Sequence, residues 1–323
     1  MNLEDLKNFV DKDLNKQKIL VVGDAMLDKY YFGEVSRISP EAPVPIAHVL
    51  NVRETLGGSA NVAHNLALLG CKTFICGQIG EDVHGETLLR KMNSCGIFSE
   101  GMLKTSQPTT TKIRVISGHQ QMIRLDFEDS SEIDGVDAEN FLSNVFKILP
   151  EVDAIIISDY GKGICTEFTC RKIISECRRL KKIVVVDPKG DDWTKYSWAN
   201  FITPNLKELN AVLPKKIKNL DEQVEPAARR VIDEFNLSGL VVTRSAAGLS
   251  LIDGEKVSHI KANAQEVFDV SGAGDTVISV FAVALAGKID SESAAYLANL
   301  AAGVVVAKVG TYAVSREELL NVL

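Results

Sequence analysis

Short runs of branched aliphatic residues recur along the chain and are separated by segments with helical periodicity. The runs are KILVVGD at 18–24, AIIISDY at 154–160, KIVVVDP at 182–188, NFITPN at 200–205 and GLVVTR at 239–244. Continuous hydrophobicity indicates strands that are buried on both faces, and alternation with helices indicates a parallel sheet. The pattern therefore predicts an α/β fold with a central, mostly parallel sheet and helices on both of its faces.

Two segments interrupt this rhythm. Residues 30–49 and 109–128 lack helical periodicity, and Lys112 and Arg114 lie two residues apart, on one face of a predicted strand. Strands with such charges are unsuited to a buried parallel sheet. We expect one domain over residues 1–323, in which the segments at about 29–50 and 109–128 form a small β-sheet that serves as a lid. The exposed edges of this sheet also predict a homodimer through the lid.

Composition narrows the class of partner. The 323 residues are 46% hydrophobic and 24% charged, which is typical of a protein with a sizeable core. The formal net charge is -7 and the cations are dispersed, which argues against a nucleic-acid partner.

The N-terminus lacks a secretory signal, and the longest apolar run, at 277–286, is too short to span a bilayer. Six cysteines without a CxxC pair indicate reduced thiols. We expect a cytoplasmic protein with a small-molecule partner and no membrane contact.

The octapeptide DVSGAGDT at 269–276 carries the clearest chemistry. Gly272 and Gly274 let backbone N–H groups turn toward an anion where a helix N-terminus adds its positive partial charge. A carboxylate beside a bound phosphate is unfavourable because both groups are negative, so Asp275 is expected to have a further role. It is suited to accept the proton of an attacking hydroxyl. The alternative is a glycine-rich turn that Asp275 caps. The chain has no GxxxxGK[ST] P-loop, and its first strand does not end in GxGxxG.

Polar residues that suit a polyol follow the first strand and open a later helix. Asp24 and Asp28 come after the first strand, at the end where open α/β sheets bind ligands. Gly57 and Gly58 permit a close approach, and Asn61 lies in the first turn of an amphipathic helix. Carboxylates, a glycine pair and an amide are suited to recognising paired hydroxyls. The alternative for GGSAN is a loop-to-helix turn capped by Ser59 or Asn61.

Two further strand ends carry groups suited to a nucleotide. Asn205 and Glu208, spaced i,i+3, project from one face of a helix start and could hold waters around Mg²⁺, which keeps much of its hydration shell. Lys189 in DPKG follows another strand and is suited to bind a phosphate, with an ordinary solvated lysine as the alternative.

Five motifs spread from 57 to 276 together resemble the ribokinase-like, PfkB-type carbohydrate kinases over essentially the whole chain. They are GGSAN, DPKG, TPNLKE, TRSAAG and DVSGAGDT. Four others resemble the subgroup that phosphorylates D-glycero-β-D-manno-heptose 7-phosphate in ADP-heptose synthesis: SRISPEAPVP, QQMIRLDFE, SDYGKG and AGVVVAKVGT. GAGDTV also departs from the GAGDxF that is commoner in sugar kinases, which favours this subgroup.

The resemblance implies a role for each matching position. Asp275 would be the base, and the backbone of Gly272, Ala273 and Gly274 would form the anion hole. The stretch Asn205, Leu206, Lys207 and Glu208 would lie at the site of ATP and Mg²⁺, with Glu208 binding the ion through water. Thr243, Arg244 and Gly248 would flank the nucleotide, and Asn299 would lie near the adenine. The sugar would be held by Asp24, Asp28, Gly57, Gly58 and Asn61.

The expected reaction is ATP-dependent phosphorylation of the heptose 7-phosphate at its anomeric hydroxyl. The lid segments supply cations for the 7-phosphate, namely Arg37, Lys112, Arg114 and Arg124. The alternatives are a kinase for ribose, a fructose phosphate or a nucleoside, and a sugar-binding sensor without catalytic activity. Some bifunctional relatives continue into a cytidylyltransferase-like domain with an HxGH motif, which does not occur here. The sequence leaves open a stand-alone kinase or the kinase half of such an enzyme.

Overall fold

The computed structural model describes residues 3–118, 120–263, 266–308, 310 and 312–323. Val309 and Thr311, which belong to the motif AGVVVAKVGT, lie outside the described residues.

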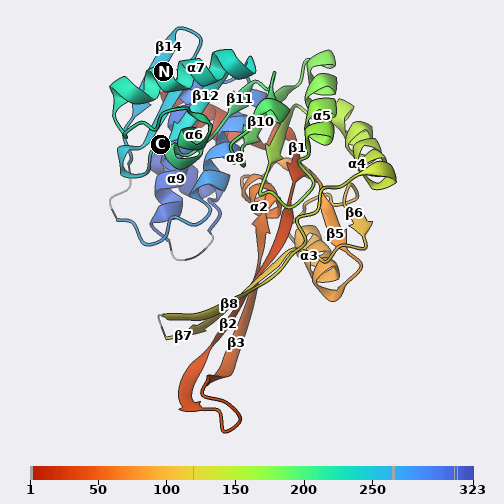
Figure 1. Ribbon diagram of the computed structural model, residues 1–323. Coiled ribbons are helices and arrows are strands. Elements are labelled where there is room, and N and C mark those ends of the chain that lie inside the picture. Colours follow the sequence, from red (N-terminus) through yellow and green to blue (C-terminus); the bar gives the residue numbers. More distant parts are fainter. Residues whose placement is uncertain (1–2, 119, 264–265, 309, 311) are drawn as a thin grey trace.

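Eight strands form the central sheet, in the order β14-β13-β12-β11-β10-β9-β1-β4 (Figure 1). Their bounds are β1 Lys18–Gly23, β4 Lys72–Cys76, β9 Ala154–Ser158, β10 Ile183–Asp187, β11 Phe201–Ile202, β12 Gly239–Thr243, β13 Leu249–Asp253 and β14 Lys256–Ile260. The strands from β4 to β12 pair in parallel, and β13 and β14 pair antiparallel at one edge. The predicted α/β class with a mostly parallel sheet is confirmed.

Helices cover both faces of this sheet. Their bounds are α1 Leu3–Asn8, α2 Ser59–Leu68, α3 Val83–Ser94, α4 Gly135–Ile148, α5 Glu167–Arg179, α6 Leu206–Val212, α7 Asp221–Phe235, α8 Ala273–Ala286, α9 Ser291–Val306 and α10 Arg316–Val322. Successive side chains of a strand point to opposite faces. Accordingly Ile19 and Val21 of β1 join a hydrophobic cluster with α2, α8 and α9, whereas Leu20 and Val22 join a second cluster with α4, α5 and α7.

Helix α8 is buried over most of its length and fixes the position of the GAGD motif. Every residue from Asp275 to Leu285 is buried, and Phe281 packs edge-on against Phe201 of β11 with ring centroids 5.1 Å apart. Two polar contacts hold α8 against α2. Thr276 Oγ1 donates to Asn65 Oδ1 at 2.9 Å, and Ser279 Oγ donates to the Val62 carbonyl at 3.2 Å. The start of α8 therefore lies against the first turn of α2.

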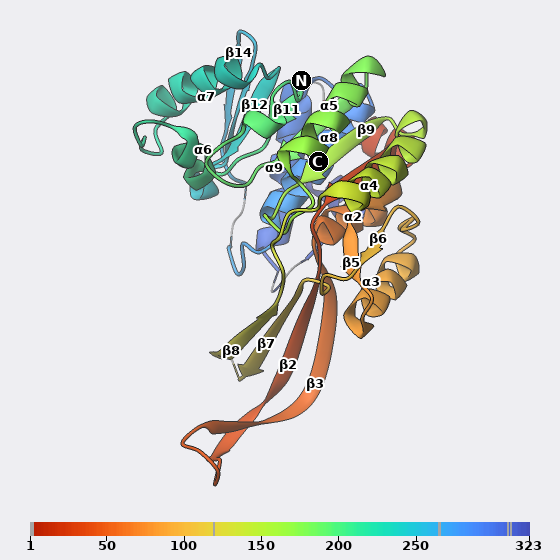
Figure 2. The same ribbon diagram turned by 45° about the vertical axis from the view of Figure 1, so that its right-hand side comes forward.

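Four strands form a second sheet that extends away from the body, which we call the projecting sheet (Figures 1 and 2). They are β2 Ala25–Ile38, β3 Pro45–Gly58, β7 Thr111–Ser117 and β8 Gln120–Phe127, in the order β3-β2-β7-β8. The sheet includes strands from both predicted lid segments and extends beyond the first of them, from 29 back to Ala25 and from 50 on to Gly58. Ala25 to Leu27 are buried. Their apolar side chains are typical of a core strand and not of an exposed sheet.

The remaining elements are short. β5 Gln78–Gly80 and β6 Leu103–Thr105 form a two-stranded parallel sheet, and single turns of 3₁₀ or π-helix occupy Phe9–Asp13, Leu14–Lys16, Leu149–Glu151, Thr194–Tyr196 and Ser245–Ala247. In the described part of the chain, no helix combines the length and the apolar character needed to cross a membrane.

Candidate active site

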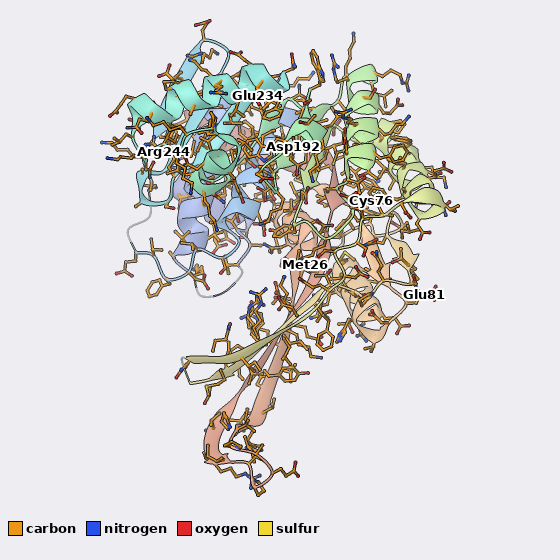
Figure 3. All side chains as sticks on the ribbon, in the orientation of Figure 1. Met26, Cys76, Glu81, Asp192, Glu234 and Arg244 are labelled. Carbon is orange, nitrogen blue, oxygen red and sulfur yellow. The ribbon has the colours of Figure 1, made fainter. Side chains whose placement is uncertain are left out.

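Two cavities meet at the N-terminus of α8. The larger, of about 460 Å³, has walls from the projecting sheet and from the body, and Met26 lines it where β2 leaves the body (Figure 3). The smaller, of about 170 Å³, lies beside the ends of β10, β11 and β12. Gly272, Asp275 and Tyr160 line both cavities. A group bound in one cavity would therefore meet a group bound in the other at Asp275.

The Asp275 carboxylate is only 6% exposed, and two side chains hold it. Asn61 Nδ2 of α2 donates to Oδ2 at 2.6 Å, and the Tyr160 hydroxyl donates to Oδ1 at 2.6 Å. Burial is the main cause that raises the pKa of Asp275 to about 6, and the Asp28 carboxylate adds to the rise, whereas the two hydrogen bonds oppose it. A carboxylate with this pKa is a suitable general base near neutral pH.

Some of the backbone N–H groups in the predicted anion cradle are free to bind an anion. Gly272 adopts a left-handed conformation (φ +82°) as the N-cap of α8, and no atom lies within 4 Å of the Cβ position at Gly274. The Ala273 N–H, which was expected to contribute, donates to the Val270 carbonyl at 3.2 Å. Within the described residues, the N–H groups of Gly272, Gly274 and Asp275 have no partner. These three amides, and not that of Ala273, are available to an anion.

Most of the residues expected to hold the sugar line the larger cavity. They are Asp28, Gly57, Gly58 and Asn61. The two glycines are required by a close approach between β2 and β3. A Cβ at Gly57 would lie 2.5 Å from Asp28 Oδ2, and one at Gly58, where φ is +56°, would lie 2.3 Å from the Asp24 carbonyl.

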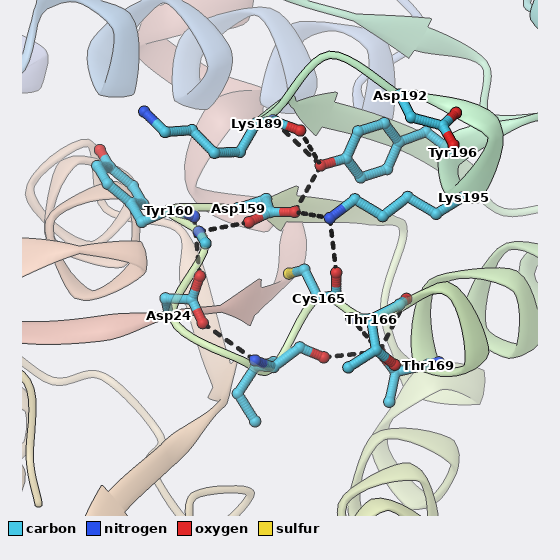
Figure 4. A network of polar contacts seen from close by, with 12 residues as sticks. Asp24, Asp159, Tyr160, Cys165, Thr166, Thr169, Lys189, Asp192, Lys195 and Tyr196 are labelled. Atoms are coloured by element: carbon cyan, nitrogen blue, oxygen red, sulfur yellow. Dashed lines mark hydrogen bonds and ion pairs between the residues drawn. The ribbon is translucent and has the colours of Figure 1, made fainter. Parts of the chain in front are cut away.

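Asp24 is an exception, because the structure does not place it on the cavity wall. Its side chain is 3% exposed, and its oxygens accept hydrogen bonds from the N–H groups of Tyr160, Lys162 and Ile164 at 2.8, 3.0 and 3.2 Å (Figure 4). Burial, with the charge of Asp159, raises the pKa of Asp24. The side chain thus fixes the loop that carries Tyr160 and has no oxygen directed at a sugar, which corrects the sequence interpretation.

The cations of the projecting sheet differ in their availability. Lys112 and Arg114 line the larger cavity, and Arg114 Nη1 lies 2.6 Å from Asp28 Oδ1. Arg124 makes a two-pronged contact with Asp126 (2.7 and 2.6 Å) and does not line the cavity. Arg37 is exposed near the outer end of β2 and is also absent from the cavity wall. Two of the four expected phosphate ligands are therefore placed at this cavity.

Among the residues of the larger cavity that sequence reasoning missed, two bear directly on its chemistry, Arg53 and Tyr160. Arg53 of β3 lines it and, within the described residues, has no acidic partner. It precedes Gly57 by four residues, so period-two alternation along β3 would have found it if the predicted segment had continued past residue 50. Tyr160 follows β9 in the quoted run AIIISDY, at the end of a strand where ligands bind.

The smaller cavity contains carboxylates together with one lysine. Lys189 and Glu208 line it as expected, and Asp187 does so in addition. Burial, together with the charges of Asp275 and Glu208, raises the pKa of Asp187 well above its usual range, and burial also raises the pKa of Glu208. A divalent cation would relieve this crowding of negative charge. Among the described residues these carboxylates form no cluster tight enough to bind one ion directly, which fits an ion held through water.

The other residues expected at the nucleotide divide into two groups. Thr243 and Asn205 line the smaller cavity, and Asn205 also forms a reciprocal capping box with Glu208 at the start of α6. The rest, outside both cavity walls, are Leu206, Lys207, Arg244, Gly248 and Asn299. Leu206 packs against the core, and Lys207 is exposed.

Arg244 has a structural environment. It is 3% exposed, and its guanidinium donates to Asn219 Oδ1 at 2.7 Å, to Ser250 Oγ at 2.8 Å and to Asp221 (Figure 3). Gly248 (φ +85°) is required by close approach to β14, because a Cβ there would lie 2.0 Å from the Ile260 carbonyl. Asn299 Nδ2 donates to the Lys261 carbonyl at 2.8 Å. Arg244, Gly248 and Asn299 therefore make structural contacts in the part of the body that adjoins Thr243.

Comparison with known sequences gives one family. Residues 16–318 match the profile described as pfkB family carbohydrate kinase. The chain is 45% identical over 312 residues to the bifunctional protein HldE of Yersinia enterocolitica serotype O:8 / biotype 1B, and 42% identical over 312 residues to HldE of Haemophilus influenzae strain PittEE. Each alignment covers 96% of this chain and 64% of the relative. The chain thus spans less than two thirds of the length of these curated relatives.

Comparison with solved structures gives the same fold. Arabidopsis thaliana ribokinase complexed with ribose and ATP matches with a TM-score of 0.74 and 20% identity, over 95% of this chain and 98% of that one. The tetrameric inhibited form of phosphofructokinase-2 from Escherichia coli matches with a TM-score of 0.77 and 16% identity, over 95% and 97%. At these identities the likeness is one of fold.

The position of Asp24 leads to a prediction about stability. Asp24→Ala removes the acceptor of three backbone N–H groups in a buried loop, so we expect the free energy of unfolding to fall by about 3 kcal/mol. The control is Asp129→Ala, because Asp129 accepts a single backbone N–H bond, from Ser131, and its loss should destabilise the protein far less than the loss of Asp24. Urea unfolding measures both. Equal stability of the two variants would contradict the assignment of Asp24 to the loop.

Proposed function

Because the chain belongs to the pfkB family of carbohydrate kinases, we propose that it phosphorylates D-glycero-β-D-manno-heptose 7-phosphate at the anomeric hydroxyl. The phosphoryl donor is ATP, and the product is the 1,7-bisphosphate, an intermediate in the synthesis of ADP-heptose for the lipopolysaccharide core. The similarity to the HldE proteins and the four motifs of the heptose subgroup support this substrate. The reaction takes place in the cytoplasm, in keeping with six cysteines that are all free thiols.

The observation that carries the proposal is the position of Asp275 on the wall shared by the two cavities. In the proposed reaction the sugar occupies the larger cavity, and the phosphates of ATP occupy the smaller one, near Lys189. Asp275 accepts the proton of the anomeric hydroxyl as its oxygen attacks the γ-phosphorus. The amides of Gly272 and Gly274, with the N-terminus of α8, stabilise the negative charge of the transferring group.

Mg²⁺ fits the smaller cavity on the chemistry of its donors. Glu208 and Asp187 would hold the ion through its waters, and the ion would neutralise charge on the phosphates when bound. Lys189 adds a positive charge to the smaller cavity. The phosphates of ATP would therefore be held on one side of Asp275, and the sugar would lie on its other side, in the larger cavity.

The charge of the larger cavity supports a phosphorylated sugar. Arg53, Lys112 and Arg114 line its wall on the projecting sheet, whereas Asp275 lines its wall on the body. Arg53 has no acidic partner within the described residues, so a bound anion would be the group that neutralises it. A neutral ribose or nucleoside would not need such cations.

A substrate panel tests the proposal. Purified chain with MgATP is assayed with D-glycero-D-manno-heptose 7-phosphate, fructose 6-phosphate, fructose 1-phosphate, ribose and adenosine. We expect turnover confined to the heptose phosphate, and we expect Arg53→Gln to raise its KM by about tenfold, because a charge-assisted contact is lost. Turnover on another sugar would overturn the heptose assignment, and binding without any turnover would favour the sensor.

The base assignment gives a second prediction. Asp275→Asn keeps the shape of the side chain but cannot accept the proton, so we expect kcat to fall by about two to four orders of magnitude while ATP still binds. Because burial raises the pKa of Asp275 to about 6, the carboxylate is ionised above that pH. The wild-type rate should therefore be lost as the pH falls through about 6. Near-normal turnover of Asp275→Asn would contradict the assignment.

We further propose that a second copy of this chain covers the outer face of the projecting sheet. Val52, Ile123, Leu125 and Phe127 lie on the face opposite the cavity and are 45%, 51%, 43% and 48% exposed. The sheet extends away from the body (Figure 2), and among these four residues Phe127, nearest the body, has a ring contact with a helix of the same chain, to His84 of α3 with centroids 6.2 Å apart. Phosphofructokinase-2 of Escherichia coli, which has a similar fold, exists in a tetrameric form. These observations support a homodimer through the projecting sheet.

Light scattering after size-exclusion chromatography tests the dimer. We expect the wild type to have the mass of two chains and Leu125→Asp to have the mass of one, because a buried unpaired charge disrupts an apolar interface. Val136→Asp is the control, since Val136 is 72% exposed on α4 of the body, and it should remain dimeric. A monomeric wild type, or a dimeric Leu125→Asp, would contradict this proposal.

A further inference from the structure

The loop after β9 brings a tyrosine to the base. The Tyr160 hydroxyl donates to Asp275 Oδ1 at 2.6 Å, while Asn61 Nδ2 donates to Oδ2 at the same distance. Burial and the charge of Asp275 raise the pKa of Tyr160 well above its usual range, so its hydroxyl keeps its proton and acts only as a donor. The carboxylate is therefore held from both oxygens, in one orientation.

The charges around Asp275 make these two donors important. The charged groups that line the two cavities with it are Asp28 of β2 with its partner Arg114 of β7, Lys112 of β7, Arg53 of β3, Asp269 before α8, Asp159 beside Tyr160, Asp187 at the end of β10, Lys189, and Glu208 of α6. Five of them are carboxylates. Among the described residues no lysine or arginine forms an ion pair with Asp275. Neutral hydrogen-bond donors must therefore offset its burial and the neighbouring negative charge.

Two buried carboxylates hold the loop that carries Tyr160, as Figure 4 shows. Asp24 accepts from the N–H of Tyr160 itself at 2.8 Å. Asp159, the preceding residue, accepts from Lys195 Nζ at 2.6 Å and from the Tyr196 hydroxyl. This support fixes the backbone on both sides of Tyr160, so its hydroxyl reaches Asp275 without further rearrangement.

We propose that Tyr160 is a positioning residue for phosphoryl transfer, whose hydroxyl keeps Asp275 ionised and directs its free lone pairs to the acceptor hydroxyl. The inference rests on the proposed function of Asp275 as the base. It goes beyond that function, because it states that Tyr160, a residue outside the GAGD motif, keeps the base ionised.

Infrared titration of Asp275 tests this inference without any substrate. The carbonyl stretch of the protonated carboxyl is followed against pH in the difference between each protein and the same protein carrying Asp275→Asn. We expect the midpoint to lie near 6 in the wild type and about one pH unit higher in Tyr160→Phe, because one hydrogen bond to the charged form is lost. Tyr312→Phe is the matched control, since its hydroxyl also donates to a carboxylate, that of Glu318 at 2.8 Å, and contacts neither Asp275 nor the loop that carries Tyr160, so the midpoint should not move.

The pH dependence of kcat provides a second readout. In Tyr160→Phe the acid limb should shift upward by the same amount, and most of the lost rate should return at high pH, whereas a merely structural defect would lower the rate at every pH. An unchanged infrared midpoint in Tyr160→Phe would overturn the inference whatever the substrate proves to be. A shifted midpoint in an enzyme that phosphorylates no sugar would support the inference on Asp275 and overturn the proposed function alone.

Discussion

Burial of the Asp275 carboxylate at the start of α8 is the constraint on which the rest of the site depends. The helix is buried from Asp275 to Leu285, and contacts from Thr276 and Ser279 hold it against α2. That packing brings Asn61 to one oxygen of the carboxylate, and the loop after β9 brings Tyr160 to the other. Because the carboxylate is removed from water, its pKa rises to about 6, and the group becomes a base suited to neutral pH.

The projecting sheet is part of the same arrangement, because it is attached to the body where the site lies. Only Asp24 separates β1 from β2, and β3 runs directly into α2 through Gly57 and Gly58. Lys162, in the loop that carries Tyr160, pairs with Glu128 just beyond the end of β8 at 2.9 Å. A movement of the projecting sheet would therefore act on both walls of the larger cavity, as the proposed reaction would require of a lid that excludes water.

The α/β class, five of the eight strands of the central sheet and the GAGD helix could be predicted from sequence, because continuous hydrophobic runs and a glycine-rich helix start have local causes. Side-chain direction could not. Asp24 and Asp28 both follow β1, yet the chain enters β2 without a turn, so Asp24 points to the β9 loop and only Asp28 reaches the cavity. Arg244 belongs to a kinase motif, but its buried guanidinium contacts Asn219 and Ser250. Arg53 lies beyond the end of the predicted lid segment, and the hydrogen bond from Tyr160 to Asp275 joins residues 115 positions apart, which no local pattern predicts.

In the proposed reaction Asp275 activates the anomeric hydroxyl of a sugar phosphate in the larger cavity. Phosphorus NMR of the product formed from D-glycero-D-manno-heptose 7-phosphate and MgATP is the sharpest test of this reaction, because it identifies which oxygen has received the phosphoryl group. We expect a second phosphorus resonance coupled to the anomeric proton, with the 7-phosphate retained. A phosphoryl group on any other oxygen, or release of inorganic phosphate in place of transfer, would contradict it.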